Sequence, residues 1–229
     1  METILLAGGF GTRLKSLTKD IPKPMVDING RPFLDYLIKY LEKNKIKKII
    51  FSVFYKSESI IDYYGSSING IEIIYSIDKG PLGTGGAILE ALKICEEKHV
   101  LVINADTYFD VKIESLLGLH LKKQNDITLS LKPMKKFDKY GYVRTNKNGR
   151  VVGFEEKKFQ ENGEIDGGVY IINNNIFQGY KHEETFSFTD YIKNNLNQLK
   201  VGSIIFDDFF IDIGTLDDYS IAKNIFKSF

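Results

Sequence analysis

The sequence predicts an α/β protein built on a Rossmann-like, mostly parallel but mixed sheet, with helices on both faces and a strand-rich C-terminal portion. In the first half, short apolar runs alternate with helical patterns, which is typical of a parallel sheet covered on both faces. From Asp126 onward the pattern changes to closely spaced strand segments, and no Pro- or Ser-rich linker separates the halves. We therefore expect one continuous domain over residues 1–229, with its two portions meeting near residue 125.

The individual elements follow from apolar runs, helical periodicity and turn residues. Strands are expected at residues 3–7, 48–54, 71–76, 100–103, 126–132, 142–145, 150–155, 169–172 and 201–206. Asn148-Gly149 predicts a hairpin turn between the sixth and seventh of these strands. Helices are expected at residues 33–41, 57–64, 85–95 and 215–226.

The ends of three predicted helices carry specific signals. Pro32 precedes apolar residues at three- and four-residue steps, and Asn44 is a C-terminal stop. Ser57 is expected to cap the second helix at its N-terminus. Thr215 and Asp218 have the spacing of a capping box at the start of the last helix.

The composition excludes several classes of protein. Hydrophobic residues make up 43% of the chain, which provides a sizeable core and excludes a disordered protein. Lys and Arg total 31 against 30 Asp and Glu, so no basic field is available for a nucleic-acid backbone. No segment approaches the roughly 20 apolar residues that span a bilayer, so no membrane partner is expected. A homo-oligomer is compatible with this composition.

The one cysteine and the three histidines predict no metal site with nitrogen and sulfur ligands. Cys95 cannot form an internal disulfide, which fits a reducing compartment, and we expect a cytoplasmic protein. Its position with Ile88 and Leu92 on one apolar helix face predicts a packing role. The histidines lack the spacing of metal ligands and are expected in packing or surface roles.

The most informative segment is the glycine loop Gly8-Gly9-Phe10-Gly11, which directly follows the first predicted strand. Glycines at this point let backbone N–H groups surround an anion. A dinucleotide fingerprint would need a glycine where Leu14 stands, and a Walker A loop would need Gly-Lys at positions 13 and 14. The second glycine cluster, residues 80–86, has Gly86 in place of the required lysine. A standard dehydrogenase and a P-loop ATPase are therefore excluded.

Two cations flank the first glycine loop. Arg13 presents a planar fork of donors suited to phosphate, and Lys23 is a compact point charge. Pro22 and Pro24 hold Lys23 on a stiff stretch of chain. A surface arginine and a surface lysine in a turn are the alternative interpretation. Two cations beside one glycine loop, at the sheet edge where α/β proteins bind ligands, favour phosphate binding.

The chain resembles the sugar nucleotidyltransferases over nearly its whole length. Their opening motif is similar to residues 6–14 followed by Pro22-Lys23-Pro24-Met25, and their second glycine loop is similar to residues 80–87. Their metal-site Asn-Gly-Asp is similar to Asn104-Ala105-Asp106, with Ala105 in place of the glycine. Further similar segments are Phe154-Glu155-Glu156-Lys157, Asp166-Gly167-Gly168-Val169-Tyr170 and Phe210-Ile211-Asp212-Ile213-Gly214-Thr215.

Within this family the chain is most similar to the short guanylyltransferases that act on D-glycero-D-manno-heptose 1-phosphate. The segments that carry this narrower resemblance are Tyr75-Ser76-Ile77-Asp78, Tyr108-Phe109-Asp110, Phe186-Ser187-Phe188 and Phe206-Asp207-Asp208. The resemblance implies a reaction of GTP with a sugar 1-phosphate, giving GDP-heptose and pyrophosphate for surface polysaccharide biosynthesis.

The resemblance also assigns residues to the two substrates. It implies that residues 1–125 mainly bind the nucleotide and residues 126–229 mainly the sugar phosphate. The implied nucleotide-binding residues are Leu6, Ala7, Gly8, Gly9, Gly11, Thr12, Arg13, Asp78, Pro81, Gly83, Thr84 and Asp106. The implied sugar-phosphate-binding residues are Glu156, Lys157 and Gly168. Arg13 and Lys23 are then the catalytic cations.

A Mg²⁺ cofactor held by Asp106 and Asp212 is implied by the same resemblance. Asp106 follows a predicted strand and so lies at the carboxyl edge of the sheet, although a turn or cap role is a serious alternative. Asp212 lies in an apolar run, where a carboxylate is costly unless it is paired or bound to metal. Mg²⁺ typically takes one or two protein carboxylates together with substrate phosphates. Only the resemblance brings the two aspartates together.

Asp78 is expected to help choose guanine. Pyrimidine-using relatives typically have a glutamine at this place, three residues before the proline of the second glycine loop. An ionised aspartate only accepts hydrogen bonds, and guanine presents two adjacent donors that one carboxylate can receive. A solvated loop aspartate beside Lys79 is the alternative interpretation.

Two other functions remain open from the sequence. A mannose- or glucose-1-phosphate nucleotidyltransferase would share much of the same pattern. A catalytically idle paralogue that binds nucleotide sugars and regulates a partner is suggested only by Ala105. The presence of Arg13, Lys23, Asp106 and Asp212 favours an active enzyme.

Overall fold

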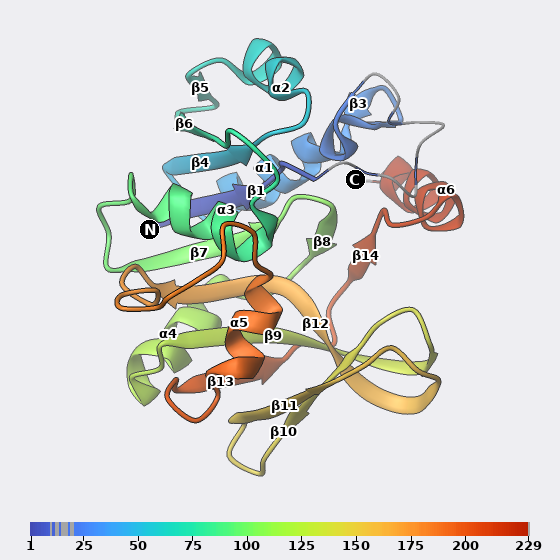
Figure 1. Ribbon diagram of the computed structural model, residues 1–229. Coiled ribbons are helices and arrows are strands. Elements are labelled where there is room, and N and C mark those ends of the chain that lie inside the picture. Colours follow the sequence, from blue (N-terminus) through green and yellow to red (C-terminus); the bar gives the residue numbers. More distant parts are fainter. Residues whose placement is uncertain (10, 12–13, 15–17, 19–20, 229) are drawn as a thin grey trace.

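A computed structural model describes the chain except for residues 10, 12–13, 15–17, 19–20 and 229 (Figure 1). Its main sheet consists of β1 (Glu2–Leu6), β4 (Lys48–Val53), β5 (Ser67–Ile68), β6 (Ile71–Ile77), β7 (His99–Asn104), β9 (Ile127–Phe137), β10 (Tyr142–Thr145), β11 (Val151–Glu155), β12 (Gln160–Asn173) and β13 (Val201–Ile205). Two small sheets pair β2 (Asp27–Ile28) with β3 (Arg31–Pro32), and β8 (Thr107–Phe109) with β14 (Phe210–Asp212).

The centre of the main sheet is parallel and its flanks are largely antiparallel. The strand order β7-β1-β4-β6 is parallel throughout. β12 pairs antiparallel with β7 and with β9, and β13 then runs parallel to β9. The hairpin of β10 and β11 turns at Gly149, as the sequence predicts, because this residue takes a positive φ of 74°. The predicted fold class is confirmed.

Helices cover both faces of the sheet. They are α1 (Phe33–Lys43), α2 (Ser57–Tyr64), α3 (Gly83–Leu92), α4 (Ile113–Lys123), α5 (Phe188–Asn194) and α6 (Leu216–Ile225), with 3₁₀ turns at Lys23–Met25 and Phe226–Ser228. In β1, Leu5 belongs to the buried cluster that includes side chains of α1, α2, α4 and α6. The preceding residue Ile4 belongs to the cluster with α3 and α5. Successive strand residues therefore reach opposite helical layers.

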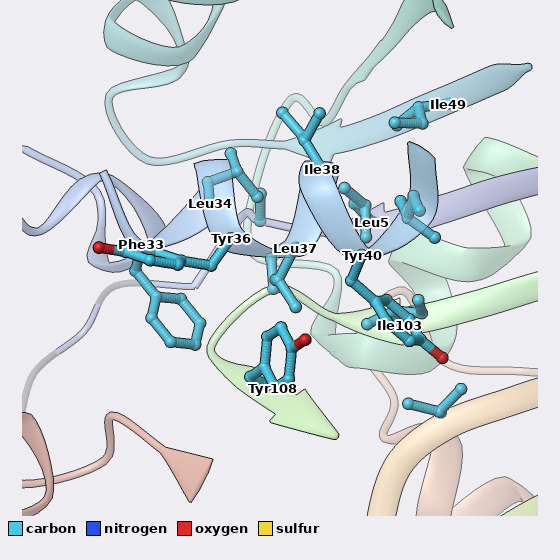
Figure 2. Packing of buried hydrophobic residues seen from close by; sticks show 14 of the residues in the cluster. Leu5, Phe33, Leu34, Tyr36, Leu37, Ile38, Tyr40, Ile49, Ile103 and Tyr108 are labelled. Carbon is cyan, nitrogen blue, oxygen red and sulfur yellow. The ribbon is translucent and has the colours of Figure 1, made fainter. Parts of the chain in front are cut away.

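Helix α1 packs its apolar face against the sheet, as the three- and four-residue spacing of its apolar residues predicts. Leu34, Leu37 and Ile38 are fully buried, and Figure 2 shows them in one cluster with Leu5 and Ile49 of the sheet. The helix ends at Asn44, whose side-chain amide donates to the Tyr40 carbonyl at 2.9 Å, beside the backbone N–H of Asn44, which donates to the same carbonyl at 3.1 Å. The predicted stop is confirmed.

Two predicted helix ends are wrong. Lys56, and not Ser57, is the N-cap of α2. Lys56 takes a left-handed conformation with a φ of 52°, so the helix begins one residue earlier than a serine cap allows, and Ser57 is buried inside it. Helix α3 ends at Leu92, because the next N–H groups bond to carbonyls only three residues back. Cys95 therefore lies beyond the helix, although it packs on the same cluster as Leu92, and burial raises the pKa of its thiol to about 12.

Helix α5 and the short strands β2, β3, β5, β8 and β14 have no counterpart in the sequence prediction. Strand β12 spans 14 residues, because it continues through Gly163 and Gly167-Gly168, where the apolar pattern is interrupted. In the part of the chain that the structure describes, no helix combines the length and the apolar character needed to cross a membrane.

His120 is a core residue at the end of the sheet opposite the glycine loops. It is 1% exposed, with Nε2 at 3.0 Å from Asn173 Oδ1 and Nδ1 at 3.0 Å from Thr128 Oγ1. The amide of Asn173 is oriented by its own bond to the Asn125 carbonyl, so Oδ1 is an acceptor and His120 Nε2 carries the proton. The network holds a neutral imidazole, which confirms the packing role.

We expect this histidine to make the protein less stable in acid. Burial lowers the pKa of His120, with Asn173 and Asp126 opposing the shift and His99 reinforcing it. The unfolded chain, with an ordinary pKa of about 6.5, then binds the proton more readily than the native protein. The free energy of unfolding should fall as the pH drops below about 6.5. Urea unfolding of the wild type and His120→Gln between pH 7.5 and 5 checks this, since the variant should lose part of the slope. Identical slopes would contradict it.

Candidate active site

A cavity of about 380 Å³ lies at the carboxyl ends of the parallel strands. Its floor includes Leu6, Ser52 and Asn104, which lie side by side because Leu6 pairs in register with both neighbours. This is the position where ligands bind in open α/β sheets. The predicted site residues that line it are Leu6, Gly8, Gly9, Lys23, Asp78, Pro81, Gly83, Thr84 and Asp106. The predicted residues Thr12 and Arg13 lie outside the described residues.

The first glycine loop continues directly from β1. The Ala7 N–H still donates to the Ser52 carbonyl at 2.8 Å, so Ala7 is buried and does not line the cavity. A Cβ on Gly8 would lie only 3.3 Å from Phe54, whereas one on Gly9 would meet nothing within 4 Å. Gly11 has a φ of +60°, and a Cβ there would approach Lys23 Cβ to 3.1 Å. The loop therefore packs closely on the segment that carries Lys23.

Lys23 forms an ion pair with Asp106 in the wall of the first cavity. Its Nζ lies 2.7 Å from Asp106 Oδ2, and its side chain is 14% exposed against 41% for the aspartate. The residue begins a 3₁₀ turn, whose bond from the Val26 N–H to the Lys23 carbonyl fixes the backbone. The pairing joins two predicted site residues that are 83 positions apart in the sequence.

Asp106 and Asp212 are brought together by the small antiparallel sheet of β8 and β14. Asp212 pairs in register with Thr107, and the Ile213 N–H donates to the Asp106 carbonyl at 3.0 Å. In Figure 1, β14 reaches β8 from the C-terminal part of the chain. The two aspartates that the resemblance assigns to one metal thus lie close along the backbone, Asp106 just before β8 and Asp212 at the end of β14.

Both oxygens of the Asp212 carboxylate accept hydrogen bonds. Oδ1 accepts from the Gly214 N–H at 2.9 Å, and Oδ2 accepts from the Tyr140 hydroxyl at 2.7 Å. Burial, and next the bond to Asp212, raise the pKa of Tyr140, so its hydroxyl stays protonated and donates. Each carboxylate oxygen offers about two lone pairs, so these bonds leave acceptor capacity on both.

The two aspartates fit a hard divalent cation as an incomplete donor set. Among the residues that the structure describes, no group of three or more His, Cys, Asp or Glu side chains is arranged to hold a metal. Two carboxylates with remaining lone pairs suit an ion that is completed by substrate phosphates, which is the usual arrangement for Mg²⁺.

Asp78 follows β6 directly and lines the first cavity. It is 9% exposed, and its Oδ1 has no hydrogen-bond partner among the described residues. Burial, and secondarily the nearby Glu90, raise the pKa of its carboxyl to about 6. An unpartnered buried carboxylate oxygen is costly, so it indicates a donor that arrives with a ligand. The alternative of a solvated loop aspartate is excluded by this burial.

The second glycine loop is bound to a distant segment, residues 185–188, which we call the strap. The Gly85 N–H donates to the Phe186 carbonyl and the Phe186 N–H to the Leu82 carbonyl, each at 3.0 Å. The hydroxyl of Thr185 donates to the Pro81 carbonyl at 2.6 Å, and the Phe188 N–H donates to Thr84 Oγ1 at 2.9 Å.

The strap explains the glycines of this loop. A Cβ on Gly83 would lie 2.4 Å from the Phe186 carbonyl oxygen, and a Cβ on Gly85 would lie 2.2 Å from the Phe186 ring. Neither distance is tolerated in a packed protein. Part of the glycine content of the second loop therefore reflects close packing of the strap, independently of any phosphate.

A second cavity of about 280 Å³ lies over the strand-rich portion. The predicted residues Glu156 and Lys157 line it, together with Tyr140 and Asp166. Glu156 is exposed and lies 3.3 Å from Lys193 Nζ of α5. This pair is worth little by itself, because both side chains are largely solvated. The cavity offers charges of both signs to a polar ligand.

Gly168 lies at an irregularity of β12, where the pairing with β9 shifts between Asp166 and Tyr170. It has a φ of 72°, and a Cβ would come within 2.9 Å of Asn104 Nδ2. Its N–H donates to Asp166 Oδ1 at 2.9 Å, and the Tyr170 hydroxyl donates to Oδ2 at 2.9 Å. The close approach that the glycine permits is to Asn104, and Gly168 lines neither cavity.

Several residues of the two cavities were not predicted. Those of the first cavity include Ser52, Phe54, Asn104 and Thr185, and those of the second include Tyr140, Thr189, Asp190 and Lys193. A signal existed for Asn104, which opens the Asn-Ala-Asp motif, and for Tyr140, whose Tyr-Gly precedes a predicted strand. The cavity residues on α5, which are Thr189, Asp190 and Lys193, had no such signal in the sequence.

Comparison with known proteins identifies relatives of nearly equal length. A family model described as nucleotidyl transferase matches residues 2–228. The chain is 46% identical over 219 residues to the D-glycero-alpha-D-manno-heptose 1-phosphate guanylyltransferase of Campylobacter jejuni, covering 96% of this chain and 97% of that protein. It is 45% identical over 224 residues to the protein of the same name from Aneurinibacillus thermoaerophilus, with 97% of each chain covered.

A solved structure agrees with these relatives. The fold is similar to the crystal structure of HddC from Yersinia pseudotuberculosis complexed with GMP-PN, with a TM-score of 0.86 and 36% sequence identity. The match covers 98% of this chain and 99% of that chain.

Proposed function

Because this chain belongs to the nucleotidyl transferase family, we propose that it transfers GMP from GTP to D-glycero-alpha-D-manno-heptose 1-phosphate. The products are GDP-heptose and pyrophosphate. The observation that carries the proposal is the first cavity, in which both glycine loops, the Lys23–Asp106 pair and the unpartnered Asp78 carboxylate surround one space. The names of the two relatives above support the choice of both substrates.

The first cavity receives the nucleotide in this proposal. Residues 1–125 mainly bind GTP, and residues 126–229 mainly bind the sugar phosphate. The proposed nucleotide-binding residues are Leu6, Ala7, Gly8, Gly9, Gly11, Thr12, Arg13, Asp78, Pro81, Gly83, Thr84 and Asp106. The proposed sugar-phosphate-binding residues are Glu156, Lys157 and Gly168, of which Glu156 and Lys157 line the second cavity.

The reaction is an in-line displacement at the α-phosphorus of GTP. An oxygen of the sugar phosphate forms the new bond to this phosphorus, and the bond from the phosphorus to the bridging oxygen of the leaving pyrophosphate breaks. No protein nucleophile is needed, so the side chains mainly position two polyanions and screen their repulsion. Lys23 supplies a compact cation at the cavity wall, and Arg13 is the second proposed cation.

Asp106 and Asp212 are the proposed ligands of a divalent metal, and Mg²⁺ is the proposed ion. When bound, the ion supplies positive charge that offsets the charge of the phosphates. The residues of the chain then act around it: Lys23 neutralises one side of Asp106, and Tyr140 and Gly214 orient Asp212. The two small-molecule substrates, with neither nucleic acid nor membrane, are the proposed partners. A cytoplasmic location and a homo-oligomer stay predictions.

Pyrophosphate release from a panel of sugar phosphates and nucleoside triphosphates tests the proposed function. The heptose 1-phosphate with GTP should give the largest kcat/KM. A larger value with mannose or glucose 1-phosphate would assign the protein to those substrates instead. Tight nucleotide binding without turnover for any pair would identify a regulatory paralogue and contradict the proposal.

Asp78→Asn should weaken the use of GTP selectively. We expect kcat/KM for GTP to fall by roughly 1–3 kcal/mol in free-energy terms, because one buried acceptor of guanine donors is replaced by an amide. The value for UTP or dTTP should fall much less or rise. Since kcat/KM reports the ionisation of the free enzyme, the wild type should lose GTP efficiency as the pH falls through about 6. The variant should lack this step. Equal losses for every triphosphate would exclude Asp78 as the guanine reader.

A further inference from the structure

Tyr140 both lines the second cavity and contacts Asp212. It lies between β9 and β10 and lines the second cavity together with Glu156 and Lys157. Its hydroxyl also donates to Asp212 Oδ2 at 2.7 Å, although the two residues are 72 positions apart. Asp212 lies on β14 and pairs with Thr107, directly after Asp106. The wall of the proposed sugar cavity is thereby bonded to a proposed metal ligand.

The hydrogen bonds on Asp212 fix the plane of its carboxylate. The terminal torsion of an aspartate is broad and roughly two-fold, so packing alone holds such a group loosely. Here the Gly214 N–H binds Oδ1 and the Tyr140 hydroxyl binds Oδ2. Without the tyrosine hydroxyl, Oδ2 loses this donor, and among the described residues the Gly214 bond is the one hydrogen bond left to restrain the rotation.

Tyr140 is itself held from three directions. Its ring packs edge-on against Phe210, which lies on the same strand as Asp212, with 6.4 Å between the ring centroids. The preceding Lys139 pairs with Asp218 of α6 at 3.3 Å. The following Gly141 is tightly packed, since a Cβ there would lie 2.5 Å from the Glu155 carbonyl oxygen. A donor fixed in this way can orient another group.

We propose that Tyr140 is a positioning residue, which orients the Asp212 carboxylate for the divalent metal and connects the sugar-phosphate cavity to that metal. This inference rests on the proposed role of Asp212 as a metal ligand. Residues that orient a metal ligand typically change metal affinity or activity by about 10–100-fold when they are removed. Tyr140→Phe keeps the ring on Phe210 and removes only the hydroxyl.

The test is Mn²⁺ binding, measured by electron paramagnetic resonance of the free ion. GTP is present at one concentration in every sample and the sugar phosphate is omitted, so no turnover occurs. We expect Tyr140→Phe to raise the Kd for Mn²⁺ by about tenfold. Tyr64→Phe is the matched control, because it removes another Tyr–Asp hydrogen bond, of 2.6 Å to Asp35, and neither of these residues lines a cavity. Its Mn²⁺ affinity should equal that of the wild type.

Asp212→Asn and the double variant separate the possible outcomes. If Tyr140 acts through Asp212, the variant Tyr140→Phe/Asp212→Asn should bind Mn²⁺ no more weakly than Asp212→Asn alone. An unchanged Kd in Tyr140→Phe beside a raised Kd in Asp212→Asn would overturn the inference and leave the metal site standing. An unchanged Kd in Asp212→Asn would overturn the metal role of Asp212, and the role of Tyr140 with it.

Discussion

Lys23→Ala should lower kcat by roughly two orders of magnitude, as the loss of one preorganised donor to a developing charge typically does. The lysine side chain is 14% exposed, lines the first cavity and stands 2.7 Å from Asp106. Its removal takes a fixed cation away from the phosphates during transfer. The melting temperature should change little, because the partner carboxylate is 41% exposed and stays solvated. Steady-state kinetics and a melting curve measure both quantities.

Lys132→Ala is the matched control for this replacement. Lys132 is 15% exposed and pairs with Asp207 at 2.8 Å, but it lines neither cavity. Its removal should leave kcat close to the wild-type value. If Lys23→Ala behaved like this control, Lys23 would be a structural partner of Asp106 without a part in the reaction.

Asp106→Asn and Asp212→Asn should each reduce metal-dependent activity by roughly a hundredfold or more, because a bound metal ion stabilises transition-state charge by several kcal/mol. The double variant should lose far less than the product of the two effects. Both residues act on one ion, and the second replacement then removes little that the first has left. Activity as a function of Mg²⁺ concentration measures all three variants.

The pairing of β8 with β14 makes this cycle informative. Asp106 directly precedes β8 and Asp212 ends the neighbouring strand β14. Asp207→Asn alters a carboxylate that pairs with Lys132 outside both cavities and should be neutral. Independent sites would give about a ten-thousandfold loss in the double variant if each single loss were a hundredfold. That additive result would show that Asp106 and Asp212 do not share a metal.

The sequence predicts the elements whose signals are local. The buried stripe of α1, the parallel strands before each glycine loop and the Asn148-Gly149 turn each follow from residues within one short window. The cap of α6 is also local, since Thr215 Oγ1 accepts from the Asp218 N–H at 3.2 Å. The predicted N-cap of α2 is wrong because Lys56 takes the left-handed conformation at that position. The residue-type preferences of lysine do not indicate this conformation.

The contacts of the candidate site depend on register between distant segments. β8 and β14 have three residues each, too few for a pattern, and lie about one hundred positions apart, yet they bring Asp106 and Asp212 together. The same holds for the bond from Tyr140 to Asp212 and for the pairing of Lys23 with Asp106. Sequence patterns name the residue types of the site, but the pairing of strands decides which of them meet.

The strap has a consequence for how the first cavity can open. Its four hydrogen bonds tie the second glycine loop to the start of α5, and each contributes about 0.5–1.5 kcal/mol. A hinge motion that parted the two halves of the molecule along this rim would have to break all four at once. Among the residues that the structure describes, Gly8, Gly9 and Lys23 make no hydrogen bond to the strap. A motion that keeps these four bonds must therefore move the second glycine loop and the start of α5 together.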